Sequence, residues 1–158
     1  MFRPQITLKS GDLFQSGAMA LVNPVNCVGV MGKGLALEFK KRFPEAFLAY
    51  KNACAQKTVR IGKVFTWVER ETLLIHFPTK NHWKDPSKIE YIQSGLPLLE
   101  FAIEWNSVRS IAIPGLGCGL GGLPWGDVKE IIISHFKKTT FSVPVEIFLY
   151  APPWEENK

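Results

Sequence analysis

The chain has 158 residues, 46% of them hydrophobic, and its 19 Lys and Arg against 14 Asp and Glu give a formal net charge of +5. This composition excludes a disordered chain, and the 13 glycines and 11 prolines follow neither a collagen nor a heptad period. No apolar run approaches the roughly 18–20 residues of a membrane helix, and the N-terminus lacks the apolar core of a signal peptide. We therefore predict one compact domain over residues 1–158, with no membrane partner.

Three cysteines, Cys27, Cys54 and Cys118, are widely separated and show neither zinc-ligand nor C-x-x-C redox spacing. An odd number of cysteines without an export signal is typical of reduced thiols in the cytoplasm. The sequence therefore predicts a cytoplasmic protein with no metal site and no bound cofactor.

Strand-like and helix-like apolar patterns alternate along the chain. Short β-rich runs predict strands at residues 6–8, 19–22, 64–68, 73–77, 108–113 and 145–150. The second run ends at Asn23-Pro24, and the third and fourth form a hairpin or neighbouring strands. Apolar residues three and four apart predict helices over residues 34–43, 44–54, 89–103 and 128–136. Interleaved strands and helices predict an α/β fold, with a mixed or largely parallel sheet covered on both faces.

The loop at residues 23–34 lies where α/β sheets bind ligands, beyond the carboxyl end of a strand. Its glycines and the helix that follows suit an anion, because glycine lets backbone N–H groups approach a ligand closely. Asn23 and Asn26 could hydrogen-bond a sugar hydroxyl. An ordinary strand-to-helix turn, with asparagines bonded to the local backbone, explains the same pattern.

A second glycine loop, at residues 114–122, follows the strand at residues 108–113. A loop with so few Cβ atoms suits a diphosphate, because its backbone amides can approach and hold the phosphate groups. The loop also contains G-x-G-x-x-G, beginning at Gly117. A Rossmann site needs an acidic residue about 20 positions later, and that position falls near Phe141 and Ser142. Two glycine loops after two separate strands favour a phosphate site over a Rossmann site.

Lys80 lies in a third loop, residues 77–85, after another strand. A lysine there could anchor a phosphate, act as a nucleophile or base, or simply be solvated. The neighbouring His82 and Trp83 could stack on a nucleobase or cap the core.

Together these loops resemble those of the macrodomains, which bind ADP-ribose, and the resemblance extends from about Gln5 to Tyr150. Residues 23–36 and 77–83 resemble more narrowly the DarG branch, antitoxins that remove ADP-ribose from thymidine bases in DNA and oppose DarT-type toxins. The resemblance implies a three-layer α/β/α sandwich with a mixed, largely parallel sheet. Antitoxins of this branch usually carry a further C-terminal domain that binds the toxin, which residues 1–158 do not include, so the chain is expected to be either part of a longer protein or a stand-alone macrodomain.

The resemblance assigns roles to individual residues. Lys80 matches the catalytic lysine, Asp12 and Leu13 match adenine contacts, and Asn23 and Asn26 match contacts to the distal ribose. The remaining expected ADP-ribose contacts are Val30, Met31, Gly32, Lys33, Gly34, Thr79, Gly115, Gly117, Cys118, Gly119, Leu120 and Gly121. Eukaryotic relatives carry an aspartate at the position of Gly121, so Lys80 would act here without that partner.

The implied activity is hydrolysis of the N-glycosidic bond that joins ADP-ribose to thymidine in single-stranded DNA. ADP-ribose, ADP-ribosylated single-stranded DNA and a DarT-type toxin are the implied partners. Lys80 would either attack the anomeric carbon with ring opening, or stabilise the leaving base and position water. The alternatives are a non-catalytic ADP-ribose reader, a hydrolase for ADP-ribosylated protein and a nicotinamide-dependent oxidoreductase. Nearby lysines form either a basic rim for DNA or a solvated face: Lys33, Lys80, Lys84 and Lys88.

Overall fold

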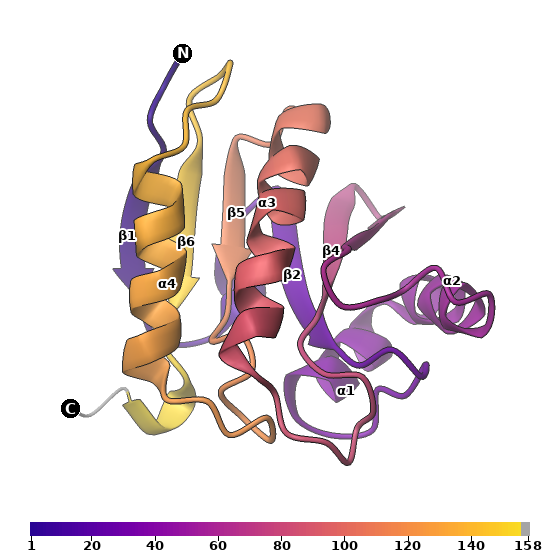
Figure 1. Cartoon of the computed structure of the whole chain (residues 1–158). Coiled ribbons are helices and arrows are strands. Elements are labelled where there is room, and N and C mark those ends of the chain that lie inside the picture. Colours follow the sequence, from indigo (N-terminus) through magenta and orange to yellow (C-terminus); the bar gives the residue numbers. More distant parts are fainter. Residues whose placement is uncertain (156–158) are drawn as a thin grey trace.

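The computed structural model describes residues 1–155 and contains a six-stranded sheet between two layers of helices (Figure 1). The strands are β1 (Gln5–Lys9), β2 (Ala20–Val25), β3 (Phe65–Glu69), β4 (Thr72–Pro78), β5 (Ser110–Ile113) and β6 (Glu146–Tyr150). Their order is β1-β6-β5-β2-β4-β3, and every neighbouring pair is parallel except the antiparallel hairpin of β3 and β4. The predicted α/β sandwich with a mixed, largely parallel sheet is therefore confirmed.

Two helices cover each face of the sheet. The helices are α1 (Gly34–Arg42), α2 (Pro44–Ala55), α3 (Ile89–Trp105) and α4 (Trp125–Lys137). Short 3-10 turns lie at Leu13–Gln15 and Pro153–Glu155. Figure 1 shows α3 and α4 on one face, with α1 and α2 behind the other. Side chains alternate along a strand, so Ile75 and Phe77 of β4 pack in the α3 and α4 core while Leu74 packs in the α1 core. None of the helices described within residues 1–155 is both long and apolar enough to span a bilayer.

Strand β2 continues to Val25, past its predicted end at Asn23-Pro24. Its ladder with β4 covers the whole strand, whereas its ladder with β5 stops at Leu21. Pro24 is tolerated because β5 no longer pairs with β2 there, and proline lacks only the N–H that such a ladder would use. The carboxyl ends of β2 and β5 are therefore not hydrogen-bonded to each other, and Asn23 lies inside the strand.

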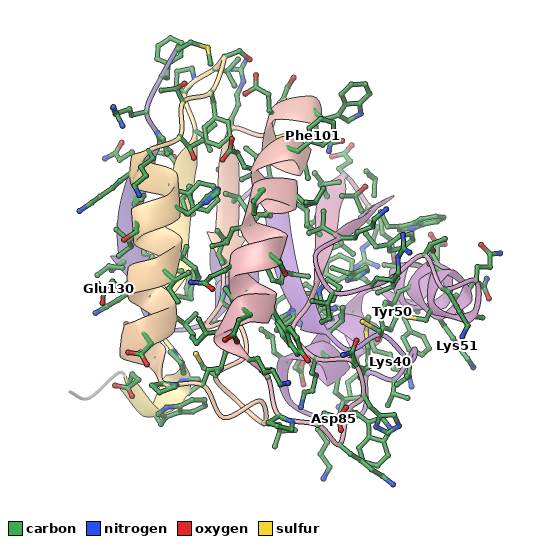
Figure 2. All side chains as sticks on the ribbon, viewed as in Figure 1. Lys40, Tyr50, Lys51, Asp85, Phe101 and Glu130 are labelled. Atoms are coloured by element: carbon green, nitrogen blue, oxygen red, sulfur yellow. The ribbon has the colours of Figure 1, made fainter. Side chains whose placement is uncertain are left out.

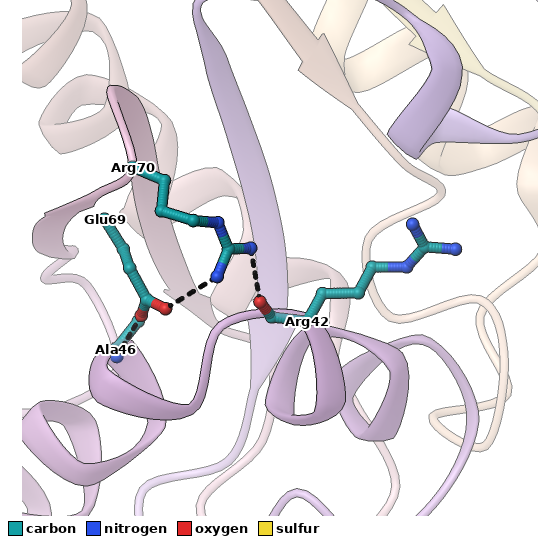
Figure 3. Close-up of polar contacts among 4 residues, drawn as sticks. All are labelled: Arg42, Ala46, Glu69 and Arg70. Atoms are coloured by element: carbon teal, nitrogen blue, oxygen red, sulfur yellow. Dashed lines mark hydrogen bonds and ion pairs between the residues drawn. The ribbon is translucent and has the colours of Figure 1, made fainter.

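The β3–β4 hairpin is attached to the junction of α1 and α2 (Figure 3). The buried Glu69 carboxylate accepts a 2.8 Å hydrogen bond from the Ala46 backbone N–H in the first turn of α2 and lies 3.2 Å from the Arg70 guanidinium. Arg70 also donates to the Arg42 carbonyl at the end of α1. A carboxylate at a helix N-terminus and a cation at a C-terminus both complement the helix dipole. The end of the β3–β4 hairpin thus stabilises both the C-terminus of α1 and the N-terminus of α2.

Helix α3 packs unusually close to β4 at Gly95. A Cβ atom at this position would lie 2.3 Å from Cζ of the fully buried Phe77 ring. Glycine is therefore required for this approach, despite its low helix propensity. The contact holds the second turn of α3 against the end of β4, and residues 79–88 connect the two elements.

Candidate functional site

The predicted loops gather at one edge of the sheet, where the parallel strands end (Figure 1). The chain leaves β2 toward α1 on one face and leaves β5 toward α4 on the other. Because these connections diverge, the position between β2 and β5 is a topological switch point, the usual place for a ligand in such sheets. The loop after β2, residues 79–88 after β4, and residues 114–122 after β5 all begin there.

Residues 79–88 link the two glycine loops. The Asn81 carbonyl accepts a 3.0 Å hydrogen bond from the Cys27 backbone N–H in the first loop. The Ser87 backbone N–H donates a 3.0 Å hydrogen bond to the Gly121 carbonyl in the second. The three loops that the sequence pointed to are therefore one hydrogen-bonded group.

The second glycine loop presents unpaired backbone amides. Within residues 1–155 the N–H groups of Gly119, Leu120 and Gly121 donate no hydrogen bond to the protein. Leu120 is exposed, whereas Cys118 is buried in the core, where burial raises the pKa of its thiol to about 12. Successive free amides form a concave anion site. In this loop the backbone is therefore the part that can contact a ligand.

The first glycine loop also has backbone N–H groups without a protein acceptor in residues 1–155. In the described part of the chain, the N–H groups of Gly32 and Lys33 have no protein acceptor. They immediately precede α1, whose first turn carries no acidic side chain. A helix N-terminus favours a negative charge, so this loop also suits an anion. Val30 is exposed, whereas Met31 is buried with its side chain in the α2 core.

Asn26 is used within its own loop. Its amide nitrogen donates to the Val30 carbonyl at 2.8 Å, and its amide oxygen accepts from the Val28 N–H at 3.1 Å and the Tyr50 hydroxyl at 2.8 Å. The alternative of local hydrogen bonds by asparagine is therefore correct for Asn26. Figure 2 labels Tyr50 on α2, from which its hydroxyl reaches this loop. A ribose contact by the Asn26 side chain stays a prediction.

Asn23 and His76 form a buried polar pair that the sequence did not reveal. They occupy paired positions of β2 and β4, and Asn23 Nδ2 lies 3.3 Å from His76 Nδ1. Burial lowers the pKa of His76 to about 3, so the ring is neutral, and donation from Asn23 assigns the proton to Nε2. Asn23 Oδ1 and His76 Nε2 have no partner among residues 1–155. The pairing of Asn23 with His76 depends on the register between β2 and β4, which the sequence pattern does not predict.

Lys80 lies in residues 79–88, the segment that is hydrogen-bonded to both glycine loops, and is partly buried. Its Nζ donates to the Trp83 carbonyl at 3.3 Å. Burial lowers the pKa of this amine, and the Asp85 carboxylate opposes that shift. Asp85 lies at the end of the molecule where these loops gather (Figure 2). A partly desolvated amine at this position has the properties of a nucleophile or an electrostatic catalyst.

The remaining predicted residues lie around this edge. Asp12 follows β1 and accepts a hydrogen bond from the Phe14 N–H at 2.9 Å, while Leu13 is buried. Thr79 is buried at the end of β4. Gly115 begins the second loop so close to Pro152 that a Cβ atom would lie 2.9 Å from that ring. Every predicted site residue therefore belongs to a segment that ends at this edge.

A groove of about 530 Å³ lies elsewhere, between α3 and α4, and its lining includes Gln93, Asp127, Glu130 and His135. Two carboxylates would repel a diphosphate, so this groove does not match the expected ligand. Nowhere in residues 1–155 do three His, Cys, Asp or Glu side chains meet in an arrangement that could hold a metal ion.

Substitution of Gly121 by alanine tests how tightly the second loop is packed. An added Cβ would lie 2.2 Å from Ser87 Oγ and 2.5 Å from the Gly117 carbonyl oxygen. We expect Gly121→Ala to lower the free energy of unfolding by about 1–3 kcal/mol, measured by urea denaturation. An aspartate side chain at this position would be still larger.

Gly119→Ala is the matched control, because no atom lies within 4 Å of its added Cβ. It should change the free energy of unfolding by less than about 1 kcal/mol. Equal losses in the two variants would contradict the packing described here.

Comparison with known proteins agrees with this geometry. The Macro domain family model matches residues 22–132. The DNA ADP-ribosyl glycohydrolase of Mycobacterium tuberculosis is 46% identical over 151 residues, which are 93% of this chain and 42% of that protein. The chain thus spans less than half the length of this relative.

Two solved structures are also similar. The macrodomain of Mycobacterium tuberculosis DarG has a TM-score of 0.89 and 46% identity, and the match covers 94% of this chain and 98% of that one. Thermosipho africanus DarTG in complex with ADP-ribose has a TM-score of 0.87 and 34% identity, over 96% of this chain and 43% of that one. The latter organism's relative is named a DNA ADP-ribosyl transferase-DNA ADP-ribosyl glycohydrolase fusion protein. With this sequence match, loop geometry and fold, the chain belongs to the macro domain family.

Proposed function

We propose that the chain hydrolyses the N-glycosidic bond between ADP-ribose and thymidine in single-stranded DNA. The observation that carries this proposal is the arrangement of Lys80 between two loops with unpaired backbone amides. The names of the Mycobacterium and Thermosipho relatives support DNA as the substrate.

In this proposal the two sets of amides bind the diphosphate. Gly32 and Lys33 donate from one side and Gly119 to Gly121 from the other, and the N-terminus of α1 adds a favourable dipole. The structure of the Thermosipho relative in complex with ADP-ribose supports ADP-ribose as the ligand. Asp12 and Leu13 would contact the adenine beyond the end of β1, and the unpaired Oδ1 of Asn23 would accept from a distal ribose hydroxyl.

The chemistry proposed for Lys80 follows from charge. Breaking the bond develops positive charge at the anomeric carbon and negative charge on the leaving thymine. Water supplies the new oxygen bond to the anomeric carbon, and the base leaves with the electron pair and takes up a proton. A cation about 3 Å from the base stabilises that leaving group. Diphosphate oxygens held by the amides would stabilise the developing cation on the other side.

The proposed biological context is an antitoxin that opposes a DarT-type toxin. The Thermosipho relative supports this pairing, since its name joins a DNA ADP-ribosyl transferase to a DNA ADP-ribosyl glycohydrolase in one chain. A cytoplasmic location fits a DNA substrate and the three free thiols, Cys27, Cys54 and Cys118.

The test is release of ADP-ribose from a short single-stranded oligonucleotide that carries one ADP-ribosyl-thymidine. The protein should restore the unmodified strand, detected by chromatography and mass. Binding of ADP-ribose without release would indicate a reader. Release from ADP-ribosylated protein but not from DNA would indicate a hydrolase for another linkage.

A further inference from the structure

Trp83 is an aromatic side chain that the site described above does not use. It lies in residues 79–88, three positions after Lys80, and its side chain is 49% exposed. Of the two predicted roles, capping the core or stacking on a base, the structure does not support the first, because Trp83 belongs to no core cluster. The indole is therefore accessible for stacking on a base, the second of these roles.

A lysine and a histidine ring lie beside the Trp83 indole. The Lys84 Nζ lies 5.1 Å from the centre of the indole ring, and the His82 ring lies 5.2 Å from it. The turn is held by hydrogen bonds from the Lys84 N–H to His82 Nδ1 at 3.1 Å and from the Asp85 N–H to the His82 carbonyl at 3.0 Å. The ring is therefore presented by an ordered turn with a cation beside it.

The backbone of Trp83 is also joined to the proposed reaction centre. Its carbonyl accepts the 3.3 Å hydrogen bond from Lys80 Nζ. The same segment is bonded to both glycine loops through Asn81 and Ser87. The backbone from which the indole projects is therefore in direct contact with the amine that would meet the thymine.

We propose that the Trp83 indole stacks on a nucleobase that neighbours the modified thymidine, while Lys84 and the exposed Lys88 contact strand phosphates. This inference rests on the proposed function, because it names how the same site recognises a strand rather than free ADP-ribose. An aromatic ring together with lysines is the usual surface for single-stranded nucleic acid, since every base has a π-face and every linkage a charge. The net charge of +5 is complementary to such a strand.

Other exposed aromatic residues provide a contrast. Phe101 and Trp105 stack on each other at the end of α3, with ring centres 5.8 Å apart. Figure 2 shows Phe101 at the opposite end of the molecule from Asp85 and therefore far from the loops. Trp105, at 76% exposed, is thus a matched control for Trp83.

The experiment compares Trp83→Ala, Trp83→Phe and Trp105→Ala with their parent protein, all in a Lys80→Ala background so that the modified oligonucleotide is not cleaved during the measurement. Fluorescence anisotropy measures affinity for an ADP-ribosylated single-stranded oligonucleotide, and calorimetry measures affinity for free ADP-ribose. We expect Trp83→Ala to weaken oligonucleotide binding at least about tenfold, or about 1.4 kcal/mol, and to leave ADP-ribose affinity within about twofold. Trp83→Phe should retain most of the affinity, and Trp105→Ala all of it.

The outcomes separate this inference from the proposed function. If Trp83→Ala keeps full affinity for the oligonucleotide, the stacking is wrong, even if the wild-type protein releases ADP-ribose from the strand. Equal losses for the oligonucleotide and free ADP-ribose also overturn it, because they show a disturbed pocket. If Trp83→Ala selectively loses oligonucleotide affinity and the wild-type protein releases no ADP-ribose, the stacking is supported and the glycohydrolase activity is refuted.

Discussion

Replacement of Lys80 by alanine is expected to lower the rate of ADP-ribose release from the oligonucleotide by about 10²- to 10⁴-fold, the range for loss of a general acid–base or electrostatic group. The affinity for free ADP-ribose should stay within about tenfold, since the proposed diphosphate contacts come from backbone amides of two other loops and not from Lys80. Single-turnover release and calorimetry measure the two quantities. An unchanged rate would remove Lys80 from the chemistry.

Two further variants refine this prediction. Lys80→Arg keeps a cation and removes a useful nucleophile, so partial activity would favour electrostatic stabilisation of the leaving base. Trapping of an adduct on wild type by borohydride, absent in Lys80→Arg, would favour covalent attack instead. Lys138→Ala changes an exposed lysine just after α4 and should retain wild-type release.

Acid is expected to destabilise the fold through His76. Burial keeps its pKa at about 3 in the folded protein, against an ordinary histidine pKa of 6.5, so only the unfolded chain takes up a proton between these values. Stability contributed by the neutral ring is complete above pH 6.5 and is lost as the pH falls toward about 3. At about 1.4 kcal/mol per pH unit well below pH 6.5, the loss should total a few kcal/mol.

Urea denaturation at several pH values measures this loss. His76→Gln cannot protonate, so its free energy of unfolding should fall less steeply than that of wild type between pH 6.5 and 4. Carboxylates titrate equally in both proteins and therefore cancel in the comparison. Parallel curves for the two proteins would show that His76 does not carry the acid sensitivity.

The fold could be predicted because its information is local. Apolar runs and stripes placed all four helices and six strands of residues 1–155 nearly where the structure has them. The end of β2 was missed because proline normally ends a strand, and its tolerance depends on β5 having already separated from β2 at Leu21. That separation is a feature of the tertiary structure, and no stretch of sequence around Pro24 predicts it.

The site could be predicted only in part. The glycine loops and Lys80 stand out by residue type and by their place after strands, and the structure brings them together. His76 and Ser87 were missed, because one acts through strand register and the other through contact with a distant loop. Asn26 shows the converse, since its side chain is of a type suited to a ligand but is hydrogen-bonded to the backbone of its own loop.

The two backbone hydrogen bonds from residues 79–88 have a consequence for how the protein opens. Because Asn81 and Ser87 connect both glycine loops, local unfolding of one loop breaks a contact of the other. The three segments should therefore exchange their protected amide hydrogens as one cooperative unit. Loops ordered in advance also lose less conformational entropy when a ligand binds. Under the proposed function, the order of each glycine loop would therefore favour ADP-ribose binding at the other loop as well.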